Sequence, residues 1–189
     1  SEWLPARHSK VRQALAAINL TLQKNGLTTA KPSYPVIYLM DNVETARGLR
    51  AASEIAAELG ELNLREETRS LALKMEAAMS QKLWNEAKRN YRVGLKINEA
   101  PLNDTGRWYP DIMANLMAIG WLPPHSRHVL LLQDLLRTKA EDKPASARTE
   151  NDLTRLVWWG IAAQGAHQTN LLADVRSQLS NFDTTVQRI

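Results

Sequence analysis

The chain of 189 residues contains no cysteine, a single phenylalanine and only four histidines. Without cysteine there is no disulfide, no thiol nucleophile and no cysteine-ligated zinc site. The four histidines, His8, His125, His128 and His167, show no ligand-like clustering. We therefore expect no structural metal, and no sequence motif calls for another cofactor. The lack of cysteine fits an exported bacterial protein and a cytosolic one equally well.

Long hydrophobic runs are also missing. No apolar stretch approaches the roughly 20 residues of a membrane-spanning helix, so we expect no membrane insertion. The chain starts at Ser1 rather than at Met and shows no signal-peptide pattern. We expect a mature or truncated chain whose export signal has been removed, which favours a periplasmic or secreted location.

Several recognition motifs are absent as well. There is no glycine-rich phosphate loop, no nucleophile elbow and no basic stripe interleaved with aromatic residues. A nucleic-acid partner is therefore not expected. The net charge of +4 arises from 24 basic and 20 acidic residues spread along the chain. We interpret this excess as a solvated surface, and a mild attraction for an anionic polymer is the alternative.

The dominant pattern is apolar spacing close to 3.6 residues, with almost no strand-like alternation. It predicts a single all-α domain over 1–189, built from stacked antiparallel helical hairpins. About seven helices are expected, over 6–24, 41–59, 64–84, 110–120, 125–139, 150–164 and 167–182. Residues 91–97 alternate with period 2, which predicts a small β-hairpin or an extended loop, and 36–40 are a second candidate for extended backbone.

Three of the predicted helices open at an acidic residue, namely Asp41, Asp111 and Asp152. Each of these helices is followed by a second amphipathic helix, so three hairpins would gather their acids around one depression. The intervals between the acids are unequal, whereas simple helical arrays hold a fixed period. The irregularity favours a curved or closed array with functional loops on one side.

Three short stretches together resemble the six-hairpin glycosidases, whose fold is an (α/α)6 toroid. They are DNVETARGL at 41–49, LWNE at 83–86 and RWYPD at 107–111. The resemblance covers roughly residues 36–165 and implies acid-led inner helices. A full toroid has about twelve helices, so this chain resembles about half of one. It is then a fragment, a domain whose remainder lies elsewhere, or a protomer completed by a partner such as a second copy.

The resemblance implies hydrolysis of a glycosidic bond in a poly- or oligosaccharide, with Asp41 and Asp111 as the catalytic pair. One carboxylic acid protonates the leaving oxygen, and a second carboxylate acts as base or nucleophile. The carboxyl groups lie about 5 Å apart for retention and roughly 6.5–9.5 Å apart for inversion. The residues do not assign the acid and base roles. The structural alternative is that each aspartate caps its own helix.

Other residues near these acids are candidates for substrate binding. They are Glu44, Arg47, Arg107, Trp108, Tyr109, Asp152 and Trp158. Aromatic rings stack on the flat C–H faces of sugars, and the arginines would contact an anionic sugar. Adjacent Trp158 and Trp159 differ by about 100° around a helix, so one belongs to the core and the other to the concave side.

Each of these candidates also has a structural interpretation. Glu44 stands three residues after Asp41, at the spacing of a capping box with Asp41 as the cap. Asp152 has the same relation to Thr149. Asp104, in the loop before the second inner helix, is either a turn former or a further residue of the cleft.

Two other functions stay open at this point. The first is a non-catalytic module that binds a glycan or serves polysaccharide secretion. The second is a helical scaffold for a protein partner, in which the acids are only helix caps.

Overall fold

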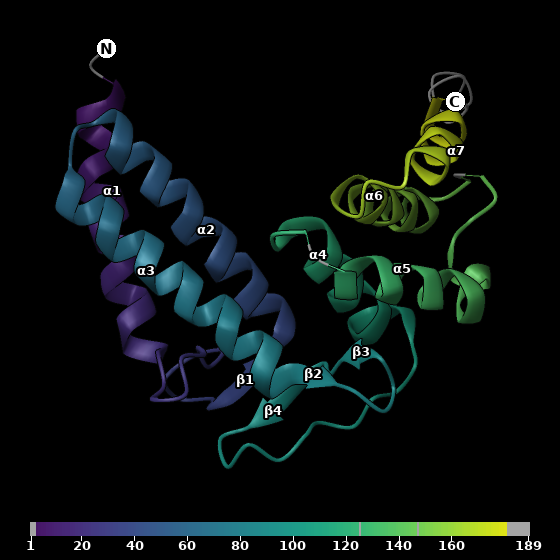
Figure 1. The fold of residues 1–189 in the computed structure, drawn as a ribbon, viewed down its shortest axis with the longest axis horizontal. Helices are drawn as coiled ribbons and strands as arrows, with labels where there is room; N and C mark the ends of the chain where they lie inside the picture. Colours follow the sequence, from purple (N-terminus) through teal and green to yellow (C-terminus); the bar gives the residue numbers. More distant parts are fainter. Residues whose placement is uncertain (1–2, 125, 147, 181–189) are drawn as a thin grey trace. The chain divides into compact units, whose positions relative to one another are not determined.

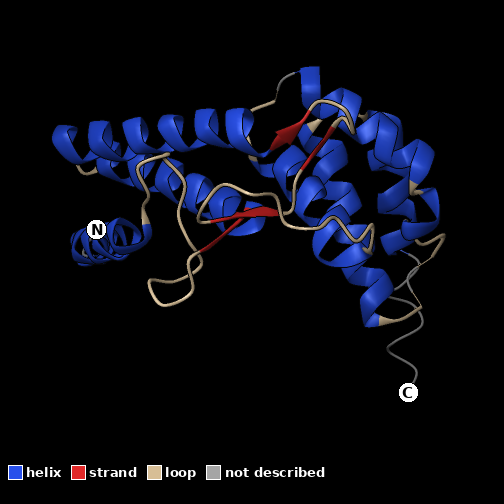
Figure 2. Cartoon of the chain, turned by 90° about the horizontal axis from the view of Figure 1, so that it is seen from below, coloured by secondary structure: helices blue, strands red, loops and turns tan. Residues whose placement is uncertain are grey.

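The structure is a computed structural model that describes residues 3–124, 126–146 and 148–180 (Figure 1). Helices dominate this part of the chain, which confirms the predicted all-α class (Figure 2). The α-helices are α1 (Trp3–Thr21), α2 (Leu39–Glu58), α3 (Leu62–Ala78), α4 (Met113–Trp121), α5 (Ser126–Thr138), α6 (Glu150–Gly165) and α7 (Thr169–Ser180).

Shorter elements connect these helices. Two π-helical segments, η1 (Met79–Leu83) and η2 (Trp108–Ile112), extend α3 and precede α4, and η3 (Ala140–Asp142) is a 3-10 turn. The strands are β1 (Val36–Tyr38), β2 (Trp84–Asn85), β3 (Asn90–Tyr91) and β4 (Gly94–Lys96). They pair as two separate two-stranded sheets, β1 with β4 and β2 with β3.

The chain divides into two compact units. Unit 1 comprises residues 1–84 and 91–103, and unit 2 comprises 85–90 and 104–189. The single domain predicted over 1–189 stays a prediction.

Unit 1 is built around the α2–α3 hairpin. The helices pack along their length, and the turn between them contains Gly60 at a positive φ of 73°, a backbone conformation that favours glycine. Each helix contributes an apolar stripe to the interface, so the predicted amphipathic pattern is confirmed here. Buried side chains on these stripes are Val43, Leu49, Ala56, Leu64, Ala72 and Met75.

The first helix packs on the other side of α2 and ends earlier than predicted. It stops at Thr21 instead of Lys24, and Asn25 and Gly26 belong to a turn that follows. That turn lets Leu22 pair with Thr28 as an antiparallel bridge. The expectation that Asn25 and Gly26 end the helix itself was therefore wrong, because the chain first leaves helical geometry to form this bridge.

The short sheet of unit 1 joins segments that are distant in sequence. Ile37 of β1 lies opposite Leu95 of β4, and Tyr38 lies opposite Gly94. A Cβ on Gly94 would lie 2.3 Å from the carbonyl oxygen of Ile37, so the pairing requires glycine there. Extended backbone at 36–40 and 91–97 is thus confirmed in part. The strand β4 pairs with β1, however, and not within its own segment.

Unit 2 contains the α4–α5 and α6–α7 hairpins, and α4 packs against α6. The α4–α6 contact depends on two glycines. A Cβ on Gly165 would lie 2.4 Å from the Ile119 carbonyl oxygen, and one on Gly120 would lie 2.4 Å from Ile161 Cγ2. The two helices therefore approach more closely than alanine would permit. The core beside this contact includes Leu116, Ile119, Leu156, Trp159 and Ala163.

We predict that Gly165→Ala destabilises the protein by about 1–3 kcal/mol, because the new methyl group would overlap backbone atoms of α4. Gly48→Ala is the matched control. Gly48 lies within α2, and no heavy atom lies within 4 Å of the place that its new methyl group would occupy, so this change should stabilise by about 0.5–1 kcal/mol. Urea denaturation followed by tryptophan fluorescence gives both values. Equal stability of the two variants would contradict the close approach of α4 and α6.

Candidate functional site

The two predicted catalytic aspartates lie in different units. Asp41 is the third residue of α2 in unit 1, and Asp111 lies in η2 of unit 2. Asp152 lies in the first turn of α6, also in unit 2. The pairing of Asp41 with Asp111 therefore stays a prediction, and each carboxyl group is considered in its own surroundings.

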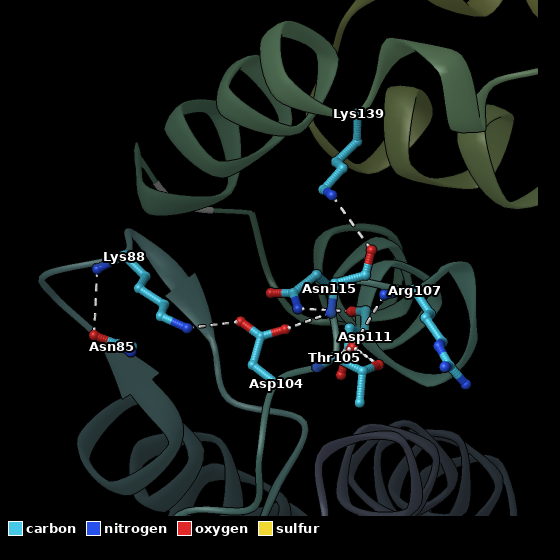
Figure 3. Close-up of polar contacts among 9 residues, drawn as sticks. Asn85, Lys88, Asp104, Thr105, Arg107, Asp111, Asn115 and Lys139 are labelled. Carbon is cyan, nitrogen blue, oxygen red and sulfur yellow. Dashed lines mark hydrogen bonds and ion pairs between the residues drawn. The ribbon is translucent and has the colours of Figure 1, made fainter.

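Asp111 is buried at the start of the helix that leads into α4. Tyr109 is extended (φ −111°, ψ 131°), and helical backbone begins at Pro110 as predicted. The Asp111 side chain is 5% exposed. Its Oδ2 accepts hydrogen bonds from Thr105 N (2.8 Å), Thr105 Oγ1 (2.5 Å) and Arg107 N (3.3 Å), as Figure 3 shows.

These contacts give Asp111 a role that differs from the helix cap considered in the sequence. Its donors come from the loop that precedes the helix, so the carboxylate fastens residues 105–107 to the start of η2. The other oxygen, Oδ1, is buried and has no hydrogen-bond partner among the described residues. The carboxylate is held in a fixed orientation while one of its oxygens remains unsatisfied, an arrangement that is uncommon in folded proteins.

An open depression of about 250 Å³ lies beside this loop in unit 2. Its polar lining includes Lys88, Asp104, Asp111, Asn115, Asp134 and Lys139. The depression thus combines carboxylates, amides and two ammonium groups with apolar lining residues such as Ile112 and Leu131. Of the polar residues, sequence reasoning singled out only Asp111 and Asp104.

Asp104 is held at the rim of the depression by Lys88, Gly106 and Asn90. Lys88 Nζ lies 3.2 Å from Asp104 Oδ2, and Gly106 N donates to Oδ1 at 3.1 Å (Figure 3). Burial alone would raise the pKa of Asp104, but the hydrogen bonds from Lys88, Gly106 and Asn90 and the charge of Lys88 together lower it. Asp104 is therefore both a turn former and a residue of the depression.

Lys139 reaches the same loop from the residue that follows α5. Its Nζ donates to the carbonyl oxygen of Gly106 at 3.3 Å (Figure 3). Among the described residues, no carboxylate lies within ion-pair distance of this ammonium group. Asn115, one turn into α4 from Asp111, donates to the Asp111 carbonyl oxygen at 2.9 Å. No sequence signal marks Lys139 or Asn115, because only the fold brings them to the loop.

The predicted aromatic residues of unit 2 differ in exposure. Tyr109 is 65% exposed, whereas Trp108 is half-buried under the Arg155 guanidinium, whose carbon lies 5.3 Å from the ring centre. Trp158 is half-buried against Trp121, with ring centres 5.0 Å apart. Trp159 is fully buried. The expectation that only one of the adjacent pair enters the core is confirmed, and Tyr109 is the most open stacking surface.

Two predicted arginines are exposed, Arg107 in the loop beside Asp111 and Arg47 on α2. The side chain of Arg107 points away from the carboxylate that its backbone N–H contacts (Figure 3). A role for either arginine in sugar binding stays a prediction.

Asp152 forms the capping box that its spacing with Thr149 indicates. Asp152 N donates to Thr149 Oγ1, and Thr149 N donates to Asp152 Oδ2, both at 3.1 Å. The hydrogen bond with Thr149 is the main cause of a lowered pKa at Asp152. The structural interpretation of Asp152 is confirmed, while sugar binding by this residue stays a prediction.

We predict that Thr149→Ala destabilises the protein by about 1 kcal/mol at neutral pH, because an amide N–H of α6 loses its acceptor. The pKa of Asp152 is lowered in the folded state, so the ionised carboxylate stabilises the fold above the unfolded pKa. This stabilisation is lost as pH falls through the folded pKa. The difference in melting temperature between wild type and Asp152→Asn should therefore shrink in acid. Thermal unfolding between pH 2 and pH 7 tests this, and a difference independent of pH would argue against an ionised cap.

Asp41 does not cap α2. The helix begins at Leu39, its N-cap residue is Tyr38, and no side-chain cap bond forms. The capping box predicted for Asp41 and Glu44 was wrong because β1 runs directly into the helix. Leu39 N donates to the Val93 carbonyl oxygen at 2.9 Å, so a backbone group satisfies the first N–H of the helix.

Asp41 and Glu44 instead form a pair of carboxyl groups one turn apart on α2. Burial raises the pKa of Asp41, and burial followed by the charge of Asp41 raises the pKa of Glu44. Asp41 is half-buried and Glu44 is exposed, so the cost of carrying a charge falls mainly on Asp41. No basic side chain among the described residues lies within ion-pair distance of either. Carboxyl groups with raised pKa values are suited to proton donation, which makes this pair a candidate acid.

We predict that Asp41→Asn raises the melting temperature at pH 7 and gives no gain at pH 3, and that Glu44→Gln, at an exposed position, has a smaller effect of the same kind. A raised folded-state pKa favours the protonated acid, so the penalty is absent below the unfolded pKa and grows as pH rises through the folded pKa. The neutral amides do not carry this penalty. An equal effect at both pH values would show that the two carboxyl groups are not strained by burial.

No group of three or more His, Asp or Glu side chains that could hold a metal ion occurs in residues 3–124, 126–146 and 148–180. Within the same ranges, no helix combines the length and apolar character needed to cross a membrane. A scan against models of protein families found no match to this chain, and a search of curated protein sequences found none either.

Proposed function

We propose that this protein acts on carbohydrate, and that the depression of unit 2 binds a poly- or oligosaccharide. The observation that carries the proposal is that hydrogen-bond donors and acceptors line the same open depression. The ammonium group of Lys139 uses one N–H on the Gly106 carbonyl oxygen and has further N–H groups to donate, and the carboxylates of Asp104 and Asp134 accept. A sugar hydroxyl both donates and accepts hydrogen bonds, so adjacent hydroxyls would satisfy both kinds of group.

Two further features support a sugar ligand. Tyr109 is exposed next to Asp111 and offers a flat ring for stacking. The stretches at 41–49 and 107–111 resemble the inner-helix openings of six-hairpin glycosidases. Under this proposal the chain is a partial (α/α)6 toroid, completed by a second copy or by another chain.

The proposed reaction is hydrolysis of a glycosidic bond. A carboxylic acid gives its proton to the glycosidic oxygen as the C–O bond breaks, and water adds to the sugar carbon while a carboxylate takes its proton. Asp41, whose pKa is raised by burial, suits the acid role. Asp111 would take the base role through Oδ1, the oxygen that has no hydrogen-bond partner among the described residues.

We predict that Asp41→Asn with Asp111→Asn lowers the release of reducing ends from a susceptible oligosaccharide by about a hundredfold or more. A panel of neutral, acidic and amino-sugar oligosaccharides identifies the substrate with the wild-type protein first. Glu66→Gln with Glu67→Gln, at two exposed acids of α3, is the control that removes the same charge. Circular dichroism checks the fold of each variant, and turnover retained by a folded double variant would refute the catalytic assignment.

A second candidate is a non-catalytic glycan-binding module, which the structural task of Asp111 favours. A carboxylate that fastens a loop and is 5% exposed need not touch substrate at all. This alternative expects saturable binding of an oligosaccharide without release of reducing ends. Lys139→Met should weaken oligosaccharide binding under both candidate functions. Unchanged binding by this variant would exclude the depression as the sugar site.

A further inference from the structure

A second depression, of about 370 Å³, lies in unit 1 between α2 and α3. Its lining includes three arginines, Arg50, Arg65 and Arg69, together with Ser53 and Glu54. None of these residues belongs to the predicted carbohydrate site. Three guanidinium groups and one carboxylate in one depression leave an excess of positive charge.

Arg50 is fixed in orientation by Glu76. Its Nε and Nη2 donate to the two carboxylate oxygens of Glu76, the second at 2.6 Å, as a two-point pair between planar groups. Two of the five N–H donors of the guanidinium are used in this way. The remaining donors are held in place, so a ligand would meet a group whose side-chain entropy has already been lost.

Arg65 and Arg69 lie one turn apart on the exposed side of α3. Like charges at this spacing repel each other and destabilise a helix slightly. Among the described residues, no carboxylate lies within ion-pair distance of either guanidinium. The nearby Glu54 acts electrostatically on Arg50, and Ser53 Oγ donates to the carbonyl oxygen of Arg65. Arg65 and Arg69 therefore form no ion pair, and Glu54 is the only carboxylate that lines the depression with them.

We propose that this depression binds a tetrahedral oxyanion, either a phosphate or a sulfate group. A planar carboxylate has two oxygens, whereas a tetrahedral anion presents three or four and can engage Arg50, Arg65 and Arg69 together. With Arg50 paired to Glu76, Arg65 and Arg69 outnumber the single carboxylate of the lining, Glu54, so the depression keeps a net positive charge that attracts an anion. The proposal does not depend on the proposed carbohydrate activity, because the depression lies in unit 1 and shares no residue with that site.

The test is titration of the full-length protein with inorganic phosphate and, separately, with inorganic sulfate at constant ionic strength, followed by nuclear magnetic resonance or calorimetry. We expect saturable binding that Arg65→Gln with Arg69→Gln weakens at least tenfold. Glu54→Gln should tighten binding two- to fivefold, since it removes the carboxylate of the lining. Lys74→Gln, on the same helix but outside the depression, is the charge control and should change the affinity less than twofold.

The arginine variant and the Lys74→Gln control together distinguish a specific site from general charge attraction. Loss of binding in the arginine variant with an unchanged Lys74→Gln affinity supports the site, and comparison of the two anions identifies the preferred one. If Lys74→Gln weakened anion binding as much as the arginine variant does, the effect would be general charge attraction, and the proposal would be overturned. The absence of saturable binding of either anion by the wild-type protein would also overturn it. Circular dichroism confirms that the exposed substitutions leave the fold intact.

Discussion

The buried carboxylate of Asp111 is the interaction on which the organisation of unit 2 depends. Three donors from residues 105–107 converge on one of its oxygens, so the loop and the start of the helix become a single rigid element. Lys88 and Lys139 then fasten the same loop from two other directions, through Asp104 and through Gly106. The loop in turn forms one side of the depression, to which it contributes Asp104 and Gly106.

The candidate carboxyl groups have two opposite kinds of surroundings. Asp104, Asp111 and Asp152 are surrounded by donors that the local backbone supplies. Asp41 and Glu44 lie side by side without such donors, and burial opposes their ionisation. A natural protein that retains destabilising acids on an otherwise regular helix invites a functional explanation, since stability is commonly sacrificed at sites of activity. This contrast is a stronger guide to chemistry than the position of an acid at a helix start.

The helices could be predicted from the sequence because their apolar spacing reflects local packing, and the capping box at Thr149 and Asp152 because it is a local motif. The cap at Asp41 was predicted wrongly, since the preceding strand supplies a backbone partner that no nearby residue reveals. The positions of Lys88, Asn115 and Lys139 could not be foreseen, because three separate segments meet there only in the fold. Whether Asp41 and Asp111 act together is still a prediction.

The division of the chain has a consequence for how the protein is made and dissected. The backbone passes between the two units three times, after residues 84, 90 and 103. Strand β1 can pair only after β4 has been synthesised. Unit 1 is therefore incomplete until residue 103 has left the ribosome. No single cut in the sequence separates the units. A shortened gene ending anywhere before that point would encode neither unit whole, whereas deletions near the C-terminus would spare the first.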